Sequence, residues 1–257
     1  MKKKIEIYRD QNIEQLMKKL IQKIASKFGF KLVKPYQRLN QPSPIPQASS
    51  SGWANLKPSE LRRLFHFEQV SRTQKLSGPI VECGVAGGSS LIFFFHLSKV
   101  LKDDRAIWGF DTFEGFPETS KEDGTFLSSN EKKQARYRKN TLGTVTDAMS
   151  LSGMSNEDIA KTRLVKGIIP DSFASYDGER VSLLNIDVDL YKPTIEALLF
   201  FWPLMEKGGV IMLDEYDYSE KDLKKWPGAK IAVDEFCNQY DVRLNRHYCG
   251  RVFLEKD

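Results

Sequence analysis

Acidic residues follow short apolar runs in the second half of the chain. Asp187 and Asp189 come directly after one such run. Asp214 and Glu215 come directly after the next. Runs of this kind are typical of buried parallel strands, and ligands bind at the carboxyl ends of such strands. If the two strands are neighbours, Asp187, Asp214 and Glu215 converge. Because converging carboxylates repel one another unless a cation lies between them, we predict these three as ligands of Mg²⁺.

The chemistry that such a site supports is the activation of a hydroxyl group. A bound cation lowers the pKa of a hydroxyl that it contacts and makes it a better nucleophile. We predict Asp187 and Asp189 as catalytic residues, with Asp189 as a candidate base or as a group that supports the metal ligands. The alternative is that these acids cap helices or pair with lysines and hold no metal.

A glycine-rich turn lies at residues 81–90, Val-Glu-Cys-Gly-Val-Ala-Gly-Gly-Ser-Ser, between an expected strand and an expected helix. Glycines let the backbone approach a ligand closely, and a helix N-terminus offers N–H groups without partners. The spacing is not the Gly-x-Gly-x-x-Gly of dinucleotide enzymes, which argues against an NAD-dependent dehydrogenase. It is a form that class I enzymes using S-adenosylmethionine (SAM) often show. The alternative is a tight turn with no ligand.

A further carboxylate, Asp111, ends the second expected strand, about 28 residues beyond the glycine turn. A carboxylate at that place can accept hydrogen bonds from both ribose hydroxyls of a bound nucleoside. The alternative is a solvated carboxylate at a strand end. The presence of the glycine turn before it favours the nucleoside interpretation.

The elements that must position these residues alternate between strand and helix from Ile80 onward. This alternation predicts a mostly parallel sheet with helices on both faces, closed by an antiparallel hairpin near the end of the chain. The expected strands are Ile80–Val85, Ala106–Phe110, Thr162–Val165, Ser182–Ile186 and Val210–Leu213, followed by the hairpin of Val242–Arg246 and Gly250–Glu255. The expected helices are Ser89–Lys102, Glu131–Thr141, Asn156–Ala160 and Thr194–Met205, and a loop followed by a helix is expected over Lys224–Phe236.

The composition is that of one α/β domain preceded by a basic arm. The chain has 257 residues, of which 40% are hydrophobic and 28% charged, enough for one sizeable core. Residues 1–40 hold eleven Lys and Arg against three Asp and Glu, whereas the remainder holds 28 basic and 31 acidic residues. Because the body is slightly acidic, we expect no nucleic-acid partner. Three widely spaced cysteines in no CxxC pair make a disulfide framework or a zinc site unexpected.

We divide the chain into an arm and linker at residues 1–50 and a catalytic domain at residues 51–257. Within the arm, apolar residues at helical spacing predict a basic amphipathic helix over residues 11–28. Such a helix can lie on an anionic membrane, so residues 1–34 are the candidate for a peripheral membrane contact. The commoner use of an apolar stripe is packing on the body or on a second subunit, which favours a homo-oligomer. Since no apolar signal or spanning segment is found, we expect a cytoplasmic protein, with peripheral attachment to the inner face of the membrane as a further option.

Several of these motifs occur together and in order in one known family. The chain resembles the macrocin O-methyltransferase (TylF/MycF-type) family, and the resemblance covers roughly residues 78–257. The segments that carry it are Glu82-Cys83-Gly84-Val85, Phe110-Asp111-Thr112-Phe113-Glu114-Gly115-Phe116-Pro117, Asp187-Val188-Asp189-Leu190-Tyr191, Gly208-Gly209-Val210, Asp214-Glu215-Tyr216 and Pro227-Gly228-Ala229-Lys230-Ile231-Ala232-Val233-Asp234-Glu235-Phe236.

The resemblance implies a class I methyltransferase fold with a Rossmann-like sheet, SAM as the methyl donor, and usually Mg²⁺. It places the metal acids at Asp187, Asp214 and position 215. The family usually has Asp-Asp-Tyr at this last point, whereas this chain has Asp214-Glu215-Tyr216, with a side chain one methylene longer at position 215. The residues that the resemblance implies as cofactor contacts are Glu82, Gly84, Val85, Gly87, Ser89, Ser90, Asp111, Thr112, Phe113 and Asp187.

The function expected from the resemblance is Mg²⁺-assisted transfer of a methyl group from SAM to a sugar hydroxyl. The acceptor would be a glycan, a nucleotide sugar or a glycosylated metabolite, as in polysaccharide or antibiotic biosynthesis. Trp226 and Tyr216 are candidates for stacking on that acceptor, and ordinary core packing is the alternative for both. Two other functions stay open: methylation of a phenolic, catechol-like hydroxyl, and a SAM-fold scaffold without catalysis.

Overall fold

The computed structural model describes residues 57–126, 129–216 and 226–257. The helix expected over residues 11–28, and the arm and linker at 1–50 to which it belongs, lie outside the described residues. The membrane contact expected through residues 1–34 therefore stays a prediction. Among the described helices, none has both the length and the hydropathy to cross a bilayer.

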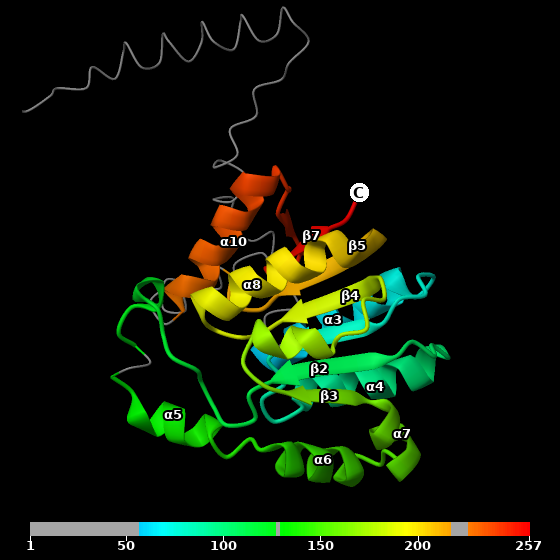
Figure 1. Cartoon of the computed structure of the whole chain (residues 1–257). Helices are drawn as coiled ribbons and strands as arrows, with labels where there is room; N and C mark the ends of the chain where they lie inside the picture. Colours follow the sequence, from blue (N-terminus) through cyan, green and yellow to red (C-terminus); the bar gives the residue numbers. More distant parts are fainter. Residues whose placement is uncertain (1–56, 127–128, 217–225) are drawn as a thin grey trace, which may run out of the picture. The chain divides into compact units, whose positions relative to one another are not determined.

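The described chain folds around a seven-stranded sheet in the order β3-β2-β1-β4-β5-β7-β6 (Figure 1). Strands β1 to β5 run parallel, and β7 pairs with β5 in the antiparallel direction. This is the expected class I methyltransferase sheet, so the predicted fold class is confirmed. The strands are β1 (Ile80–Cys83), β2 (Ile107–Asp111), β3 (Arg163–Lys166), β4 (Val181–Ile186), β5 (Met205–Leu213), β6 (Asn245–Arg246) and β7 (Val252–Glu255).

Helices cover both faces of the sheet. On one face Phe65 of α3 and Phe94 of α4 are buried with Val145 of α6. On the other face Phe201 of α8 and Phe236 of α10 are buried against the strands. Burial of each such side chain contributes roughly 1.5–3 kcal/mol. The helices are α3 (Pro58–Thr73), α4 (Ser89–Leu101), α5 (Glu131–Tyr137), α6 (Leu142–Leu151), α7 (Asn156–Lys161), α8 (Tyr191–Phe201) and α10 (Pro227–Tyr240), with short 3₁₀ turns η2 (Lys121–Asp123), η3 (Asp171–Ser175) and η4 (Trp202–Leu204).

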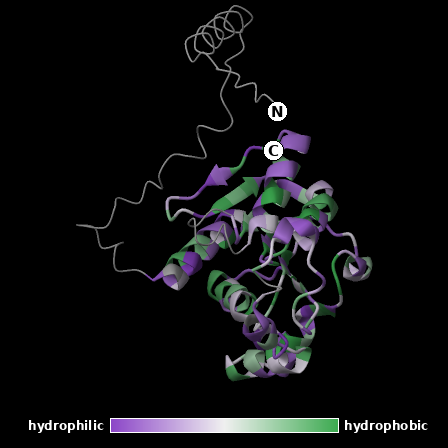
Figure 2. Cartoon of the chain, turned by 90° about the vertical axis from the view of Figure 1, so that its left-hand side faces the viewer, coloured by the Kyte–Doolittle hydropathy of each residue, from purple (hydrophilic) through white to green (hydrophobic). Residues whose placement is uncertain are grey.

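The helices carry hydrophobic and hydrophilic residues together, as their mixed colours show in Figure 2. This pattern is expected of helices that pack on a sheet with one side and meet solvent with the other. Two of them, α3 and α6, were not predicted from the sequence. The start of α8 was also misplaced: it begins at Tyr191 instead of Thr194, because Pro193 is tolerated in a first helical turn. Strand β5 begins at Met205, five residues before the expected Val210.

A buried ion pair fixes α3 to the sheet. The guanidinium of Arg105 lies against the carboxylate of Asp103, and both side chains are almost fully buried. The same guanidinium donates to the backbone carbonyl of Thr73 at 3.1 Å and to the hydroxyl of Ser182 at 2.8 Å. Since Thr73 ends α3 and Ser182 lies in β4, Arg105 sets the position of that helix against the strand.

We expect Asp103→Ala to destabilise the protein by about 3–5 kcal/mol, because it leaves the buried Arg105 charge without its partner. Urea unfolding followed by circular dichroism measures the change. The matched control is the double variant Asp103→Ala/Arg105→Met, which removes both charges and should recover part of the loss. Equal stability of the single variant and the wild type would show that the pair does not fix α3.

Candidate active site

The turn after β1 brings the ends of two neighbouring strands close together. Gly84 has a φ of +92°, and a Cβ atom built on it would lie 1.9 Å from the backbone oxygen of Asp187. No other residue fits there, because both the backbone conformation and the contact require glycine. The amide of Asp187 donates to the carbonyl of Cys83 at 2.8 Å. Asp187 is therefore held directly beside the glycine turn.

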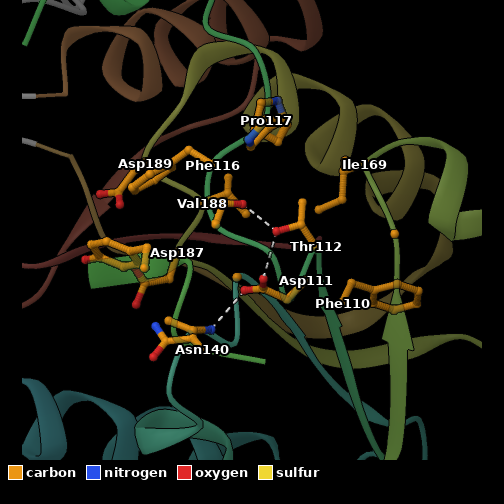
Figure 3. Close-up of a pocket in the computed structure, with 16 residues that line it drawn as sticks. Phe110, Asp111, Thr112, Phe116, Pro117, Asn140, Ile169, Asp187, Val188 and Asp189 are labelled. Carbon is orange, nitrogen blue, oxygen red and sulfur yellow. Dashed lines mark hydrogen bonds between the residues drawn. The ribbon is translucent and has the colours of Figure 1, made fainter. Parts of the chain in front are cut away.

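The carboxylate of Asp111 is fixed by backbone amides on either side of it. Ala86 N donates to Oδ2 at 2.9 Å and Phe113 N donates to Oδ1 at 2.8 Å. The hydroxyl of Thr112 lies 3.4 Å from Oδ1 (Figure 3). Because these bonds form within the protein, the carboxylate has its orientation before any ligand binds. That orientation faces a cavity, as expected of a ribose-binding acid.

The cavity beside Asp111 is narrow, with a volume of about 70 Å³. In Figure 3 Asp187 and Asp189 lie on one side of it, and Phe110 and Ile169 lie on the other. Its walls are mostly apolar, with Asp111 among the few charged groups. A flat aromatic ring attached to a sugar would match an apolar slot with the carboxylate of Asp111 in its wall.

A wider cavity of about 570 Å³ adjoins the narrow one. The two share part of their walls, so a ligand can extend from one into the other. The shared lining residues are Gly84, Ala86, Tyr137, Asn140, Asp187 and Asp189. The wide cavity is in addition lined by Arg62, Glu82, Val85, Gly87, Ser89, Ser90, Arg136, Asp214, Glu215, Trp226 and Arg251.

The three acids predicted as metal ligands meet at this wide cavity. Asp187, Asp214 and Glu215 each offer a carboxylate oxygen, and these atoms all lie within 4.8 Å of one another. The convergence follows from the pairing of β4 with β5, as the sequence predicted. The longer Glu215 side chain thus still reaches the cluster. An all-oxygen donor set of this kind is the set that Mg²⁺ prefers.

The crowding of these acids changes their protonation. Burial, followed by the nearby charge of Asp214, raises the pKa of Asp187 to about 7. Burial and the charge of Asp187 raise the pKa of Glu215 well above its usual range. Both shifts favour the neutral, protonated form of these two carboxyl groups when no cation is present.

Two arginines neutralise part of the acid cluster, and neither was identified from the sequence. Arg62 of α3 lies with Nη2 2.9 Å from Asp214 Oδ2 and with Nη1 3.5 Å from Asp187 Oδ2. Arg251, which precedes β7, forms a buried ion pair with the other oxygen of Asp214. Both oxygens of Asp214 are therefore bonded to guanidinium groups. A cation that binds the cluster must share Asp214 with them.

A model of the macrocin O-methyltransferase (TylF) family matches residues 52–245 of the chain. The chain belongs to this family. The family predicted from the motifs is thus confirmed, and this family is one of O-methyltransferases.

The chain is also similar to individual O-methyltransferases of Streptomyces. The demethyldecarbamoylnovobiocin O-methyltransferase of Streptomyces niveus is 28% identical over 168 residues, which is 64% of this chain and 60% of that relative. The chain thus spans less than two thirds of that relative's length. The 8-demethyl-8-(2,3-dimethoxy-alpha-L-rhamnosyl)-tetracenomycin-C 4'-O-methyltransferase of Streptomyces olivaceus is 24% identical over 213 residues, 79% of this chain and 76% of the relative.

One solved structure, that of the O-methyltransferase NovP, has the same fold. It superposes with a TM-score of 0.65 and 21% sequence identity, over 79% of this chain and 83% of that one. At this identity the likeness supports the fold alone. It agrees with the parallel sheet and antiparallel end strands described above.

Nearly all residues that the sequence predicted for the site line one of the two cavities. Phe113 is the exception, because its side chain is buried in the core at 1% exposure. Only its backbone amide contacts the site, by donating a hydrogen bond to Asp111. Tyr216 was wrongly considered for stacking on a ligand, since its hydroxyl donates to Asp234 within the fold and its ring is buried. Trp226 does line the wide cavity. Tyr137 lines both cavities and was missed.

Glu82 is the most deeply buried acid of the site, at 1% exposure. Its Oε1 accepts a hydrogen bond from Asn185 Nδ2 at 2.8 Å, whereas Oε2 has no partner among the described residues. Burial and the charge of Asp187 raise the pKa of Glu82 well above its usual range. An unpaired, buried carboxylate oxygen at a cavity wall favours a ligand that carries a donor or a positive charge.

We expect Glu82→Gln to raise the melting temperature at pH 8. A buried acid with a raised pKa stabilises the fold below its unfolded pKa of about 4.3, and this contribution is lost as the pH rises toward the folded pKa. Because the neutral amide of Glu82→Gln does not lose this contribution, the difference in melting temperature between the variant and the wild type should be smaller at pH 5. Thermal unfolding of both proteins at the two pH values measures it, with the exposed Glu131→Gln as the control. A variant that is less stable than the wild type at pH 8 would contradict this account of Glu82.

Proposed function

We propose that this chain transfers a methyl group from SAM to a sugar hydroxyl, with the help of Mg²⁺. The observation that carries the proposal is the common wall of the two cavities. A slot suited to a nucleoside, with Asp111 in place, opens beside Asp187 into a space lined by the acid cluster. Membership of an O-methyltransferase family supports the reaction class.

The cofactor would extend along this common wall. Its adenine would occupy the narrow cavity between Phe110 and Ile169, and its ribose hydroxyls would donate to Asp111. The methionine part would then follow the glycine turn into the wide cavity. Its ammonium would pair with the free oxygen of Glu82, and its carboxylate would lie near Ser90, at the N-terminus of α4.

The chain's part in the reaction is to hold the acceptor in line with the sulfonium. SAM bound there would supply its methyl group to the hydroxyl oxygen, and the electron pair of the broken carbon–sulfur bond would remain on sulfur, giving S-adenosylhomocysteine. Correct alignment of this kind can supply several kcal/mol of the barrier reduction. The glycine turn and the residues beside Asp187, which line the wide cavity, would hold SAM and the acceptor in this alignment.

The hydroxyl proton would pass to Asp189. This residue is 8% exposed, lines both cavities and has a φ of +64°, in the left-handed region that non-glycine residues rarely adopt. Strained backbone of this kind costs of order 1–3 kcal/mol and is commonly found at functional sites.

Asp187, Asp214 and Glu215 would hold the Mg²⁺ ion. Bound there, the cation supplies positive charge that lowers the pKa of a sugar hydroxyl. Their oxygen atoms already lie close together, and the pKa values of Asp187 and Glu215 are raised because negative charges crowd at this point. Both observations fit a divalent cation.

A sugar as the acceptor is supported by one relative and by the cavity wall. The name of the Streptomyces olivaceus relative contains a rhamnosyl group. In this chain Trp226 and Tyr137 present aromatic groups to the wide cavity beside several polar side chains. Aromatic surface next to hydrogen-bonding groups suits a sugar ring, which has apolar faces and polar edges.

We expect Asp111→Asn to weaken SAM binding by at least about tenfold, because the charged acceptor of the ribose hydroxyls is lost. Isothermal titration calorimetry with SAM measures the dissociation constant. Asp147→Asn, the same change at an exposed position of α6, is the control and should leave binding unaltered. If the wild-type protein binds no SAM, the proposed function is wrong.

We expect Arg62→Met to tighten Mg²⁺ binding by tenfold or more. The guanidinium competes with a cation for Asp187 and Asp214, and one charge at 4 Å contributes roughly 1–4 kcal/mol. Mg²⁺ titrations of the complex with S-adenosylhomocysteine measure the change, and the exposed Arg243→Met is the matched control. Unchanged or weaker Mg²⁺ binding in Arg62→Met would contradict the assignment of these ligands.

A further inference from the structure

A third cavity, of about 290 Å³, lies between α3 and α4 and adjoins the wide cavity. The two cavities share Arg62, Arg251, Ser89 and Ser90 as lining residues. A molecule in the wide cavity can therefore extend past these side chains into the third one. The proposed methyl transfer makes no use of this space.

The two adjoining cavities have opposite electrostatic character. The wide cavity is lined by five carboxyl groups, those of Glu82, Asp187, Asp189, Asp214 and Glu215. None of the described residues that line the third cavity is acidic, whereas three are arginines: Arg62, Arg63 and Arg251. The third cavity therefore favours an anionic group.

Arg63 is the arginine available for such a group. Arg62 and Arg251 already form ion pairs with the acid cluster. Arg63 is exposed and forms no ion pair with the part of the chain that the structure describes. Its five N–H donors are therefore free to bind oxygen atoms of a ligand.

A buried imidazole in the same wall also lacks a hydrogen-bond partner. His66 is 2% exposed, and its ring contacts Phe94 with a centroid distance of 5.0 Å. Neither ring nitrogen forms a hydrogen bond with a described residue. Because His66 lines the third cavity, its imidazole is available to donate a hydrogen bond to a ligand there.

The N-terminus of α4 supplies further donors. Its N-cap is Gly88, which has no side chain to bond the first-turn amides of this 13-residue helix. Ser89 and Ser90, which begin the helix, line the third cavity. A helix N-terminus, an unpaired arginine and two hydroxyls together form a typical set of donors for phosphate oxygens.

We propose that the third cavity binds a phosphate group of the acceptor, so that the sugar to be methylated is a phosphorylated one. This inference rests on the proposed function, because the sugar hydroxyl must lie in the wide cavity beside the acids. The phosphate lies beyond Arg62 and Arg251, where the acidic wall gives way to a basic one. In the proposed function the SAM carboxylate lies near Ser90, so the donors left for the phosphate are Arg63, His66 and Ser89.

The test is a calorimetric titration of inorganic pyrophosphate into the protein saturated with S-adenosylhomocysteine, in buffer without Mg²⁺. The saturating ligand occupies the cofactor site with its own carboxylate, which separates the two sources of negative charge. We expect pyrophosphate to bind the wild-type complex, to bind Arg63→Gln at least tenfold more weakly and to show no binding to Arg63→Glu. Arg243→Gln, the same change at an exposed arginine that lines none of the three cavities, should bind as the wild type does.

Three outcomes would overturn the phosphate site: no binding of pyrophosphate to the wild-type complex, equal binding by Arg63→Gln, or binding that is lost once S-adenosylhomocysteine is added. The last would assign the cavity to the cofactor carboxylate. Binding of S-adenosylhomocysteine is measured first, in a separate titration. If S-adenosylhomocysteine does not bind, the result counts against the proposed function. If S-adenosylhomocysteine binds but pyrophosphate does not, the result counts only against the phosphate site.

Discussion

The convergence of five carboxyl groups at the ends of β1, β4 and β5 is the constraint on which the rest of the structure depends. Two unit charges 4 Å apart repel by roughly 4 kcal/mol at a protein surface, so this cluster cannot be fully ionised without compensation. The chain compensates in two ways. Without a bound cation, burial and mutual repulsion favour the neutral forms of Asp187 and Glu215, and two arginines bond the oxygens of Asp214. The net charge left at the site is suited to a divalent cation.

Two elements outside the acid cluster, helix α3 and the turn at Gly84, position charged groups of the site. Helix α3 must lie where it can bring Arg62 to the cluster, and Arg105 fixes its other end against β4. Gly84 permits the contact with the backbone of Asp187 that places this carboxyl at the common wall of the cavities. Electrostatics and backbone sterics thus both determine the position of Asp187, through its ion pair with Arg62 and its contact with Gly84.

The sequence predicts the sheet and the acids well, because their signals are local. Asp111, Asp187 and Asp214 each follow a short apolar run, and the topology then fixes where they meet. Arg62 and Arg251 were missed because nothing in their neighbouring residues distinguishes them from other surface arginines. Their partners lie far away in the chain, and only the folded structure brings them together.

Other errors have similar causes. Tyr216 directly follows the acids, which made it a candidate for ligand contact, but its ring turns into the core toward Asp234. Tyr137 is the opposite case. Its neighbours in the sequence are polar and form no motif, but Tyr137 lines both cavities. Proximity along the chain predicts which strand end a residue belongs to. It does not predict the direction of its side chain.

The pairing of β7 with β5 has a consequence for the order of events during synthesis. Arg251 lies directly before β7, so the strand that completes this edge of the sheet also delivers a charge to the site. All the acids and their strands leave the ribosome earlier, since proteins are made from the N-terminus onward. Until β7 inserts, Asp214 lacks one of its two guanidinium partners. The nascent chain therefore gains its active-site charge balance and its last strands in one late step.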